Sequence, residues 1–321
     1  MFEATELSYT YPSGRRGLRK VSIDGDPGDR VIVMGPNGSG KSTFLRLVST
    51  ELASRPGSLR LFGRSHPRPG RAVRRKIGIV QDTPVHLEDL TGMENGLLFA
   101  ELYGMDRAEA SRAFLVLFAS LGLDDAVHVP TREYSYGMKK KLLIAEALVH
   151  DPEMLILDEP ALGLDPPTRA SLMRMLRKRS EKGVCTLVAT NEPSLAQELA
   201  TVVVFLLDGE VVAEGSPAEL MAKVGRSTRI EIQVAGSPSI GKGDGNPMTA
   251  PVLEGLPADV SIQQMPGRIL AESESGPDVL PRLVDAVLGA GLKITRIELR
   301  EPDLTDVFEL VTGQALNPES G

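Results

Sequence analysis

Residues 31–42 read Val-Ile-Val-Met-Gly-Pro-Asn-Gly-Ser-Gly-Lys-Ser, so that a short apolar run passes directly into a glycine-rich loop. The apolar run has the length and composition of a buried strand, and a helix is expected to begin near Lys41. From Gly35 to Ser42 the loop fits the pattern G-x-x-x-x-G-K-[ST], whose glycines let backbone N–H groups converge on a phosphate at a helix start. The alternative is a glycine-rich turn with an accidental lysine, and the flanking strand and helix disfavour it.

This phosphate loop supplies most of the predicted contacts to ATP. Lys41 is expected to reach the β- and γ-phosphates, and the Ser42 hydroxyl is expected to take one position on Mg²⁺. The other predicted ATP contacts in and beside the loop are Gly35, Asn37, Gly38, Ser39, Gly40 and Thr43.

A second apolar run, Leu155-Ile156-Leu157, ends in the acidic pair Asp158 and Glu159. The Asp158 carboxylate is expected to hold Mg²⁺ through water, and Glu159 to orient or deprotonate an attacking water as a general base. A helix-capping pair would be the better interpretation of these two residues alone. Together with the phosphate loop, they favour hydrolysis of ATP to ADP and phosphate.

The spacing of apolar residues predicts the fold class. Besides residues 31–34, buried strands are expected at 76–80, 154–157, 185–189 and 202–207, and their alternation with helices predicts a parallel α/β sheet. Apolar residues between about 83 and 150 instead take helical spacing. We therefore predict a phosphate-loop NTPase core over residues 1–225, with an inserted helical subdomain at about 83–150.

After Gly215 the sequence changes character. Strands are expected at residues 229–234, 260–264, 268–271 and 293–299, and an amphipathic helix at about 278–288. A segment rich in Gly, Pro and Ser, residues 235–251, is expected to be flexible. These features predict a small C-terminal α+β domain over residues 226–321.

The bulk composition excludes several classes of protein. Of the 321 residues, 41% are apolar and 25% charged, which is ordinary for a globular protein. The apolar run at residues 202–207 is far shorter than the ~20 residues that span a bilayer. The first residues do not resemble a signal peptide, and the single cysteine, Cys185, fits a reducing cytosol and is expected as buried filler. These observations predict a cytoplasmic protein.

The net charge of −7 belongs to the C-terminal third of the chain. Residues 229–321 carry 14 acidic and 7 basic side chains, and the chain totals of 43 and 36 leave 29 of each for the rest. An acidic region is repelled by nucleic acid and by anionic lipid, so a protein partner is expected and a nucleic acid is not.

The order of the motifs resembles that of the nucleotide-binding subunits of ABC transporters. After the phosphate loop come Gln81, the run Ser135-Tyr136-Gly137-Met138 (called the signature below), the acidic pair, and Gly163-Leu164-Asp165. The resemblance covers residues 1 to about 216. The phrase Pro302-Asp303-Leu304-Thr305-Asp306-Val307-Phe308 resembles the end of the accessory domain in bacterial drug and polyketide exporter ATPases.

The resemblance implies partners and further site residues. Two such subunits close head to tail on two ATP molecules, so that the signature of one chain, Ser135, Tyr136, Gly137 and Met138, faces the γ-phosphate bound by the other, and Asp165 crosses the interface. Tyr11 would stack on adenine, although Tyr9 could serve instead and a core aromatic is the alternative. Gln81 would sense Mg²⁺.

The same resemblance implies a separate membrane permease as partner, with the ATPase peripheral on the inner face of the cell membrane. A homodimer is favoured and a heterodimer stays open.

The chain departs from the family pattern at two places. Asn191 occupies the position of the family's switch histidine, and the signature has Tyr134, Tyr136 and Met138 where Leu, Gly and Gln are common. Loss of one charge-stabilising donor can cost about 3 kcal/mol, so slow hydrolysis is predicted, with Asn191 still offering an N–H group. Two basic runs, residues 71–76 and 139–141, are expected as solvated faces or as contacts to an acidic element or lipid headgroups.

The same residues bear on two other functional classes. An ATP-clamped regulatory partner with negligible hydrolysis is the alternative, and Glu159 argues against it. An ABC ATPase acting on DNA or the ribosome is disfavoured because the chain has one cassette and no coiled-coil heptads.

Overall fold

The computed structural model describes residues 1–65, 70–224, 227–235, 260–265, 267–273 and 276–316. The chain divides into two compact units, Met1–Pro217 with Val311–Gly321, and Ala218–Leu310. The predicted boundary between residues 225 and 226, and nearly all of the segment predicted to be flexible at 235–251, lie outside the described residues, so both stay predictions.

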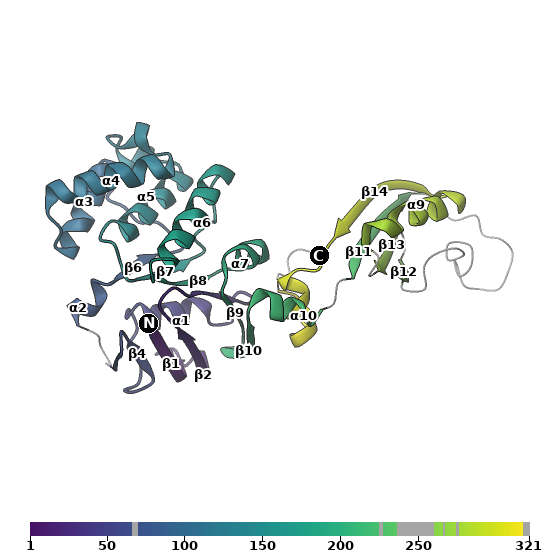
Figure 1. Ribbon diagram of the computed structural model, residues 1–321, viewed down its shortest axis with the longest axis horizontal. Coiled ribbons are helices and arrows are strands. Elements are labelled where there is room, and N and C mark those ends of the chain that lie inside the picture. The colour runs from purple at the N-terminus through teal and green to yellow at the C-terminus, as the bar shows by residue number, and fades with distance from the viewer. Residues whose placement is uncertain (66–69, 225–226, 236–259, 266, 274–275, 317–321) are drawn as a thin grey trace. The chain divides into compact units, whose positions relative to one another are not determined.

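A six-stranded sheet forms the centre of the first unit (Figure 1). Five of its strands, from β6 to β9 in sheet order, are parallel to one another, and the edge strand β10 pairs antiparallel with β9. The four central apolar strands are almost fully buried, as expected for a parallel sheet covered on both faces. In sheet order the strands are β6 (Ile77–Val80), β7 (Met154–Asp158), β8 (Cys185–Ala189), β3 (Arg30–Met34), β9 (Val202–Leu207) and β10 (Glu210–Gly215).

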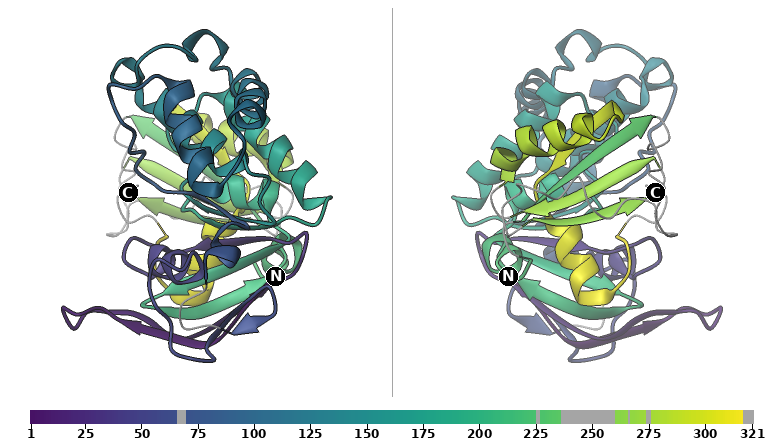
Figure 2. Two further views of the ribbon diagram at one scale, coloured as in Figure 1. Left: turned by 90° about the vertical axis from the view of Figure 1, so that its left-hand side faces the viewer. Right: turned by 90° about the vertical axis from the view of Figure 1, so that its right-hand side faces the viewer.

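A second, antiparallel sheet packs near the first, and helix α1 (Lys41–Val48) lies between them (Figure 2). One apolar core contains Phe44 and Leu47 of α1 together with residues of both sheets, so the helix that follows the phosphate loop is fixed on two sides. The strands of this sheet, in order, are β2 (Arg16–Gly25), β1 (Phe2–Thr10), β4 (Leu59–Leu61) and β5 (Arg64–Ser65). The remaining helices of the sheet region are α2 (Arg71–Arg74), α6 (Pro166–Ser180) and α7 (Pro193–Leu199).

A helical subdomain is inserted between β6 and β7. Thr91 and Glu94 form a reciprocal capping box at the start of α3, and Asp106 caps α4. Phe114 and Phe118 stack in its interior with ring centroids 5.7 Å apart. The helices are α3 (Gly92–Tyr103), α4 (Arg107–Leu121) and α5 (Tyr136–Leu148), with short 3-10 turns η1 (Asp124–Ala126) and η2 (Thr131–Glu133).

The C-terminal unit contains a four-stranded antiparallel sheet in the order β12–β13–β11–β14. Helix α9 (Leu280–Gly289) lies across one face of it, and Leu283 and Val287 pack on Ile230 and Ile232 (Figure 2). The other elements are α8 (Pro217–Met221), β11 (Thr228–Ala235), β12 (Ser261–Met265), β13 (Arg268–Ser273), η3 (Gly276–Val279), β14 (Lys293–Arg300) and α10 (Leu304–Thr312).

The predicted fold class is confirmed. The strands expected at 185–189 and 202–207 have those bounds, and the other expected strands and the C-terminal helix match within a few residues. Cys185 is fully buried, and burial raises the pKa of its thiol to about 12. Among the described residues, no helix is both long enough and apolar enough to cross a membrane.

Candidate functional site

The phosphate loop connects the end of β3 to the first residue of α1. Gly35 has φ +150°, and a Cβ there would lie 2.1 Å from the carbonyl oxygen of Leu206, so only glycine lets the loop pass β9 this closely. The Lys41 Nζ atom donates to the carbonyl oxygens of Gly35 at 2.5 Å and Pro36 at 3.2 Å. Burial lowers the pKa of Lys41, and the carboxylates of Glu159 and Asp158 oppose this. The ammonium group is thus held beside two acidic side chains and has no ion-pair partner among the described residues.

The acidic pair lies at the carboxyl end of β7. Burial raises the pKa of Asp158, and a hydrogen bond from Ser42 opposes the rise. Glu159 follows with φ +43°, a left-handed backbone conformation that is strained for a residue with a Cβ. The predicted metal residues Ser42 and Asp158 are therefore adjacent, as the chemistry of an oxygen-ligated cation requires.

Two residues outside β7 orient the Glu159 carboxylate. Thr190 Oγ1 donates to Oε2 at 2.9 Å, and the Asn191 backbone N–H donates to Oε1 at 3.1 Å. The Asn191 Nδ2 group donates to Asn37 Oδ1 at 3.3 Å, which connects the switch position to the phosphate loop. Burial raises the pKa of Glu159, whereas the Thr190 hydrogen bond and Lys41 lower it. The structure thus places Asn37, Glu159 and Asn191 next to one another.

Two polar atoms of the site are buried and have no hydrogen-bond partner among the described residues: Ser39 Oγ and Asn191 Oδ1. Buried polar atoms in folded proteins are almost always hydrogen-bonded. An exception therefore needs an explanation, such as a bound water, ion or ligand. The Ser39 hydroxyl can donate to a phosphate oxygen next to the buried Lys41 cation, whereas Asn191 Oδ1 can only accept and suits a water molecule or another donor.

Tyr11 lies at the rim of the same region. Its hydroxyl and that of Thr43 are 2.9 Å apart, and Arg15 stands over its ring at 4.8 Å from the centroid. Tyr9 packs edge-on against Tyr11 at 5.0 Å and contacts the apolar core, so Tyr11 is the more outward of the two. Arg15 was not predicted, and its only signal in the sequence is its position in the turn that follows Tyr11.

A cavity of about 380 Å³ contains most of the predicted ATP residues. Neither the signature nor Asp165 lines it within the described part of the chain, and Gln81 lines a second cavity of about 340 Å³ that also touches Asp158. The residues around the first cavity are Tyr11, Arg15, Arg16, Gly17, Asn37, Gly38, Gly40, Lys41, Ser42, Thr43, Arg46, Asp82, Asp158 and Glu159.

The signature forms the first turn of α5. Ser135 is the N-cap, and its hydroxyl accepts a hydrogen bond from the Met138 backbone N–H at 3.2 Å. A Cβ on Gly137 would lie 2.7 Å from the carbonyl oxygen of Gly163, so glycine is required by this contact as well. The Tyr136 side chain is 46% exposed, and its hydroxyl donates to the Asp82 carbonyl oxygen at 3.1 Å.

Asp165 is engaged within its own chain. Its carboxylate caps α6 by accepting from the Thr168 backbone N–H at 2.9 Å and pairs with Lys141 Nζ at 2.9 Å. These contacts, the Thr168 N–H first, hold the pKa of Asp165 well below its usual range. Its predicted role across an interface stays a prediction.

The expectation of a solvated face at residues 139–141 is wrong for Lys140. Its side chain is fully buried, and Nζ donates to the carbonyl oxygens of Gln81 at 2.9 Å, Asp82 at 2.8 Å and Asp158 at 3.3 Å. Composition does not reveal which lysine of a run faces inward. In the other basic run, Arg71, Arg74, Arg75 and Lys76 are exposed as expected.

The chain was then compared with known proteins. The ABC transporter family matches residues 18–162. A daunorubicin resistance ATP-binding protein of Streptomyces coeruleorubidus is 31% identical over 88% of this chain and 86% of its own length. A fluoroquinolones export ATP-binding protein of Mycobacterium tuberculosis (strain CDC 1551 / Oshkosh) is 30% identical over 97% of this chain and 92% of its own length.

Solved structures of the same kind are similar to about two thirds of this chain. The ATP-binding subunit of an ABC transporter is 30% identical with a TM-score of 0.65, covering 70% of this chain and 92% of that chain. A dimeric ATP-binding cassette in a post-hydrolysis state, bound to ADP and Pi, is 27% identical with a TM-score of 0.62, covering 67% of this chain and 98% of that chain.

Proposed function

The chain belongs to the ABC transporter family of ATP-binding proteins, and on that premise we propose that it is the ATP-hydrolysing subunit of an exporter whose membrane permease is a separate polypeptide. One observation carries the proposal: Lys41, Asp158 and Glu159 line a single cavity at the carboxyl end of the central sheet. The relatives named for daunorubicin resistance and fluoroquinolone export support the direction of transport.

The oxygen ligands around Asp158 fit Mg²⁺. The Ser42 hydroxyl and the Asp158 carboxylate are already hydrogen-bonded to one another, and Gln81 follows β6, the strand next to β7. We assign these three residues to the ion. When bound with ATP, Mg²⁺ supplies positive charge to the β- and γ-phosphate oxygens.

The protein's own part in hydrolysis is to bind the phosphates and to position one base. Lys41 is buried and constrained by two carbonyl oxygens, so its charge is fixed toward the loop. Thr190 donates to one oxygen of the Glu159 carboxylate and Asn191 to the other, so the orientation of the carboxylate is fixed. Burial raises its pKa, which makes the carboxylate a better proton acceptor for water.

A second subunit completes each site in this proposal. The signature lines neither cavity, although Ser135 begins a 13-residue helix whose N-terminus can face an anion. We assign Ser135, Tyr136, Gly137 and Met138 to the ATP held by the partner, and Asp165 to the interface. A homodimer is the simplest such assembly.

Exposed apolar side chains between Gln81 and the end of α3 support docking of the permease. Four large apolar side chains in this stretch of sequence are more than 40% exposed, and a protein partner would remove them from water. They are Val85, Leu87, Leu98 and Leu102. We infer that a permease segment binds here and keeps the ATPase peripheral on the inner face of the membrane.

The test is steady-state ATP turnover with Mg²⁺ for the wild type and Glu159→Gln. We expect turnover in the wild type, and its loss in the variant with ATP still bound, because only the base is removed. Retained turnover in Glu159→Gln would exclude this residue as the base. If neither protein turns over ATP although both bind it, the chain is a regulatory clamp.

We also propose that hydrolysis is slow because Asn191 replaces the switch histidine. One N–H of its amide is directed to Asn37 Oδ1 at 3.3 Å, which leaves one N–H, rather than a histidine ring N–H, to donate to a γ-phosphate. Asn191→His is expected to raise the turnover rate, by up to ~100-fold if the full donor is restored. Equal rates for the wild type and the variant would contradict this proposal.

A further inference from the structure

Two side chains one turn apart on α5 hold the backbone that follows β6. Tyr136 Oη donates to the Asp82 carbonyl oxygen at 3.1 Å, and Lys140 Nζ donates to the same oxygen at 2.8 Å and to that of Gln81 at 2.9 Å. Residues four apart lie on one face of a helix, so a single face of the signature helix makes all three hydrogen bonds. A tyrosine at position 136 thus has a contact that glycine could not provide.

Lys140 also connects this backbone to the next strand. Its third acceptor is the Asp158 carbonyl oxygen at 3.3 Å, and its side chain is fully buried. A buried ammonium group is costly unless each of its N–H groups has an acceptor, and three carbonyl oxygens match its three donors. The contact set is therefore specific for a lysine in this position.

The three carbonyl oxygens belong to the residues around the Mg²⁺ site. Gln81 and Asp82 directly follow β6, and Asp158 ends β7, with Val80 and Leu157 paired between the two strands. Gln81 and Asp158 are also two of the three residues assigned above to Mg²⁺. The start of α5 is thus attached to the backbone of the metal ligands rather than to their side chains.

We propose that Tyr136 and Lys140 are positioning residues that couple the signature helix of a subunit to the Mg²⁺ site of that same subunit. The inference rests on the proposed function. Because the signature serves the ATP of the partner, these two residues connect the two composite sites: engagement of α5 in one site fixes Gln81 and Asp158 in the other.

The test measures metal affinity separately from catalysis. Mn²⁺ is titrated calorimetrically into ATP-loaded Glu159→Gln protein, alone and combined with Tyr136→Phe, Lys140→Met or Lys139→Met. Lys139 is the matched control, since it neighbours Lys140 on the helix and pairs instead with Glu88 at 3.1 Å. ATP affinity without divalent cation is measured alongside, because a purely structural defect would lower both.

Outer contacts that orient metal ligands typically matter by 10- to 100-fold, so we expect Lys140→Met to weaken Mn²⁺ binding about tenfold. Tyr136→Phe removes one of two donors to Asp82, and its effect should be about threefold. Lys139→Met should change neither affinity, and Lys140→Met should bind metal-free ATP as the parent does.

Unchanged Mn²⁺ affinity in Lys140→Met and Tyr136→Phe would overturn the inference and leave the proposed function intact. If Lys140→Met does not fold, Tyr136→Phe decides, since it removes only the hydroxyl of a half-exposed side chain. A parent protein that binds no ATP would instead refute the proposed function and this inference with it.

Discussion

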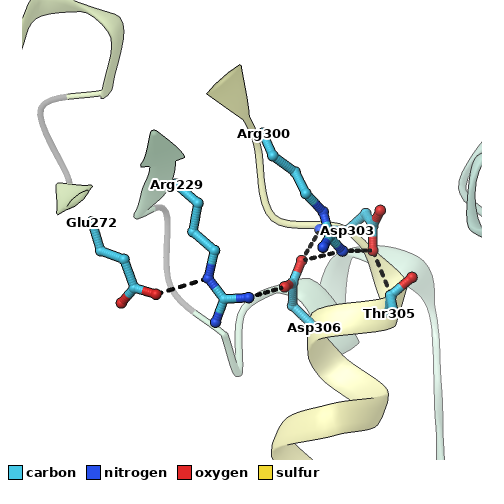
Figure 3. A network of polar contacts seen from close by, with 6 residues as sticks. All are labelled: Arg229, Glu272, Arg300, Asp303, Thr305 and Asp306. Atoms are coloured by element: carbon cyan, nitrogen blue, oxygen red, sulfur yellow. Dashed lines mark hydrogen bonds and ion pairs between the residues drawn. The ribbon is translucent and has the colours of Figure 1, made fainter. Parts of the chain in front are cut away.

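Two groups of charged side chains in this chain differ in whether their hydrogen-bonding capacity is used up. In the first unit, Lys41 faces Asp158 and Glu159 without forming an ion pair, and Ser39 Oγ and Asn191 Oδ1 are buried without a partner among the described residues. In the C-terminal unit, two arginines and three acidic residues satisfy each other (Figure 3). The first arrangement needs a ligand to be complete, and the second needs none.

The C-terminal network centres on Asp306 of α10. Its carboxylate, 6% exposed, pairs with Arg229 of β11 at 3.2 Å and Arg300 of β14 at 3.3 Å, and accepts from the Asp303 backbone N–H at 2.8 Å. Arg229 continues to Glu272 of β13 at 2.7 Å (Figure 3). The network therefore fastens three strands and a helix start to each other, which is a structural role.

Lys41→Met should show the difference between the nucleotide site and the C-terminal network most clearly, because it should lower turnover and leave stability almost unchanged. The loss of one preorganised charge at the phosphates is expected to lower turnover at least ~100-fold, or about 3 kcal/mol. The free energy of unfolding should change by less than about 1 kcal/mol, because methionine keeps the apolar stem and removes a buried charge. Turnover and urea unfolding are both measured. The matched control is Lys20→Met, at a lysine that is 77% exposed, and an equal loss of turnover there would contradict the assignment.

Asp306→Asn is expected to give the opposite result, a loss of stability with little change in turnover. Breaking a fully buried ion pair costs 3–5 kcal/mol, and since both arginines are almost half exposed we expect about 2 kcal/mol here. The measurement is amide hydrogen exchange of β11 in the full chain, which reports local opening. Turnover should stay within twofold of the wild type. Glu272→Gln, at a carboxylate that is 47% exposed, should cost less than about 1 kcal/mol.

The two units also differ in how much of their structure could be predicted from the sequence. The phosphate loop and acidic pair are local, because the backbone of each motif fixes where its residues lie once β3 and β7 are strands. The sheet order β12–β13–β11–β14 and the ion pairs of Asp306 join residues up to 77 apart in the chain, and no local pattern specifies such pairing.

Lys140 shows a second limit of prediction from sequence. Three successive lysines have the same composition whichever of them is buried, and only the position of β6 and β7 beside α5 decides that Lys140 meets three carbonyl oxygens. Tyr136 and Lys140 are four residues apart, so their common face could have been noted. What that face contacts could not, because the acceptors are backbone atoms of distant segments.

The burial of His150 should make the stability of the folded chain depend on pH. It follows α5, stacks on Tyr103 at 3.8 Å between centroids, and has its Nδ1 buried with no partner among the described residues. Burial lowers the pKa of His150 to about 4. The unfolded chain, with a pKa near 6.5, then binds more protons than the folded one between those values, so stability is present above about pH 6.5 and is lost as pH falls toward 4.

We expect this histidine to cost at most about 2 kcal/mol of stability between pH 7.5 and 5. Urea unfolding followed by circular dichroism at both pH values measures the loss, which should be smaller in His150→Gln. The exposed His128→Gln is the control and should keep the wild-type dependence. An unchanged pH dependence in His150→Gln would show that other groups cause it.

The smallest effect is expected at the rim of the nucleotide cavity, where a side chain that lines the cavity already has contacts within the protein. Tyr11 lines the cavity, yet its hydroxyl already contacts Thr43 and Arg15 stands over its ring, whereas Tyr9 packs on the core. Stacking on a base contributes about 1–3 kcal/mol, and we expect the lower end, a roughly fivefold weaker ATP affinity in Tyr11→Leu. Tyr9→Leu should change ATP affinity less than twofold while lowering stability. The reverse order, measured with a fluorescent ATP analogue, would assign the adenine contact to Tyr9 and place Tyr11 among the groups whose contacts are complete without ligand.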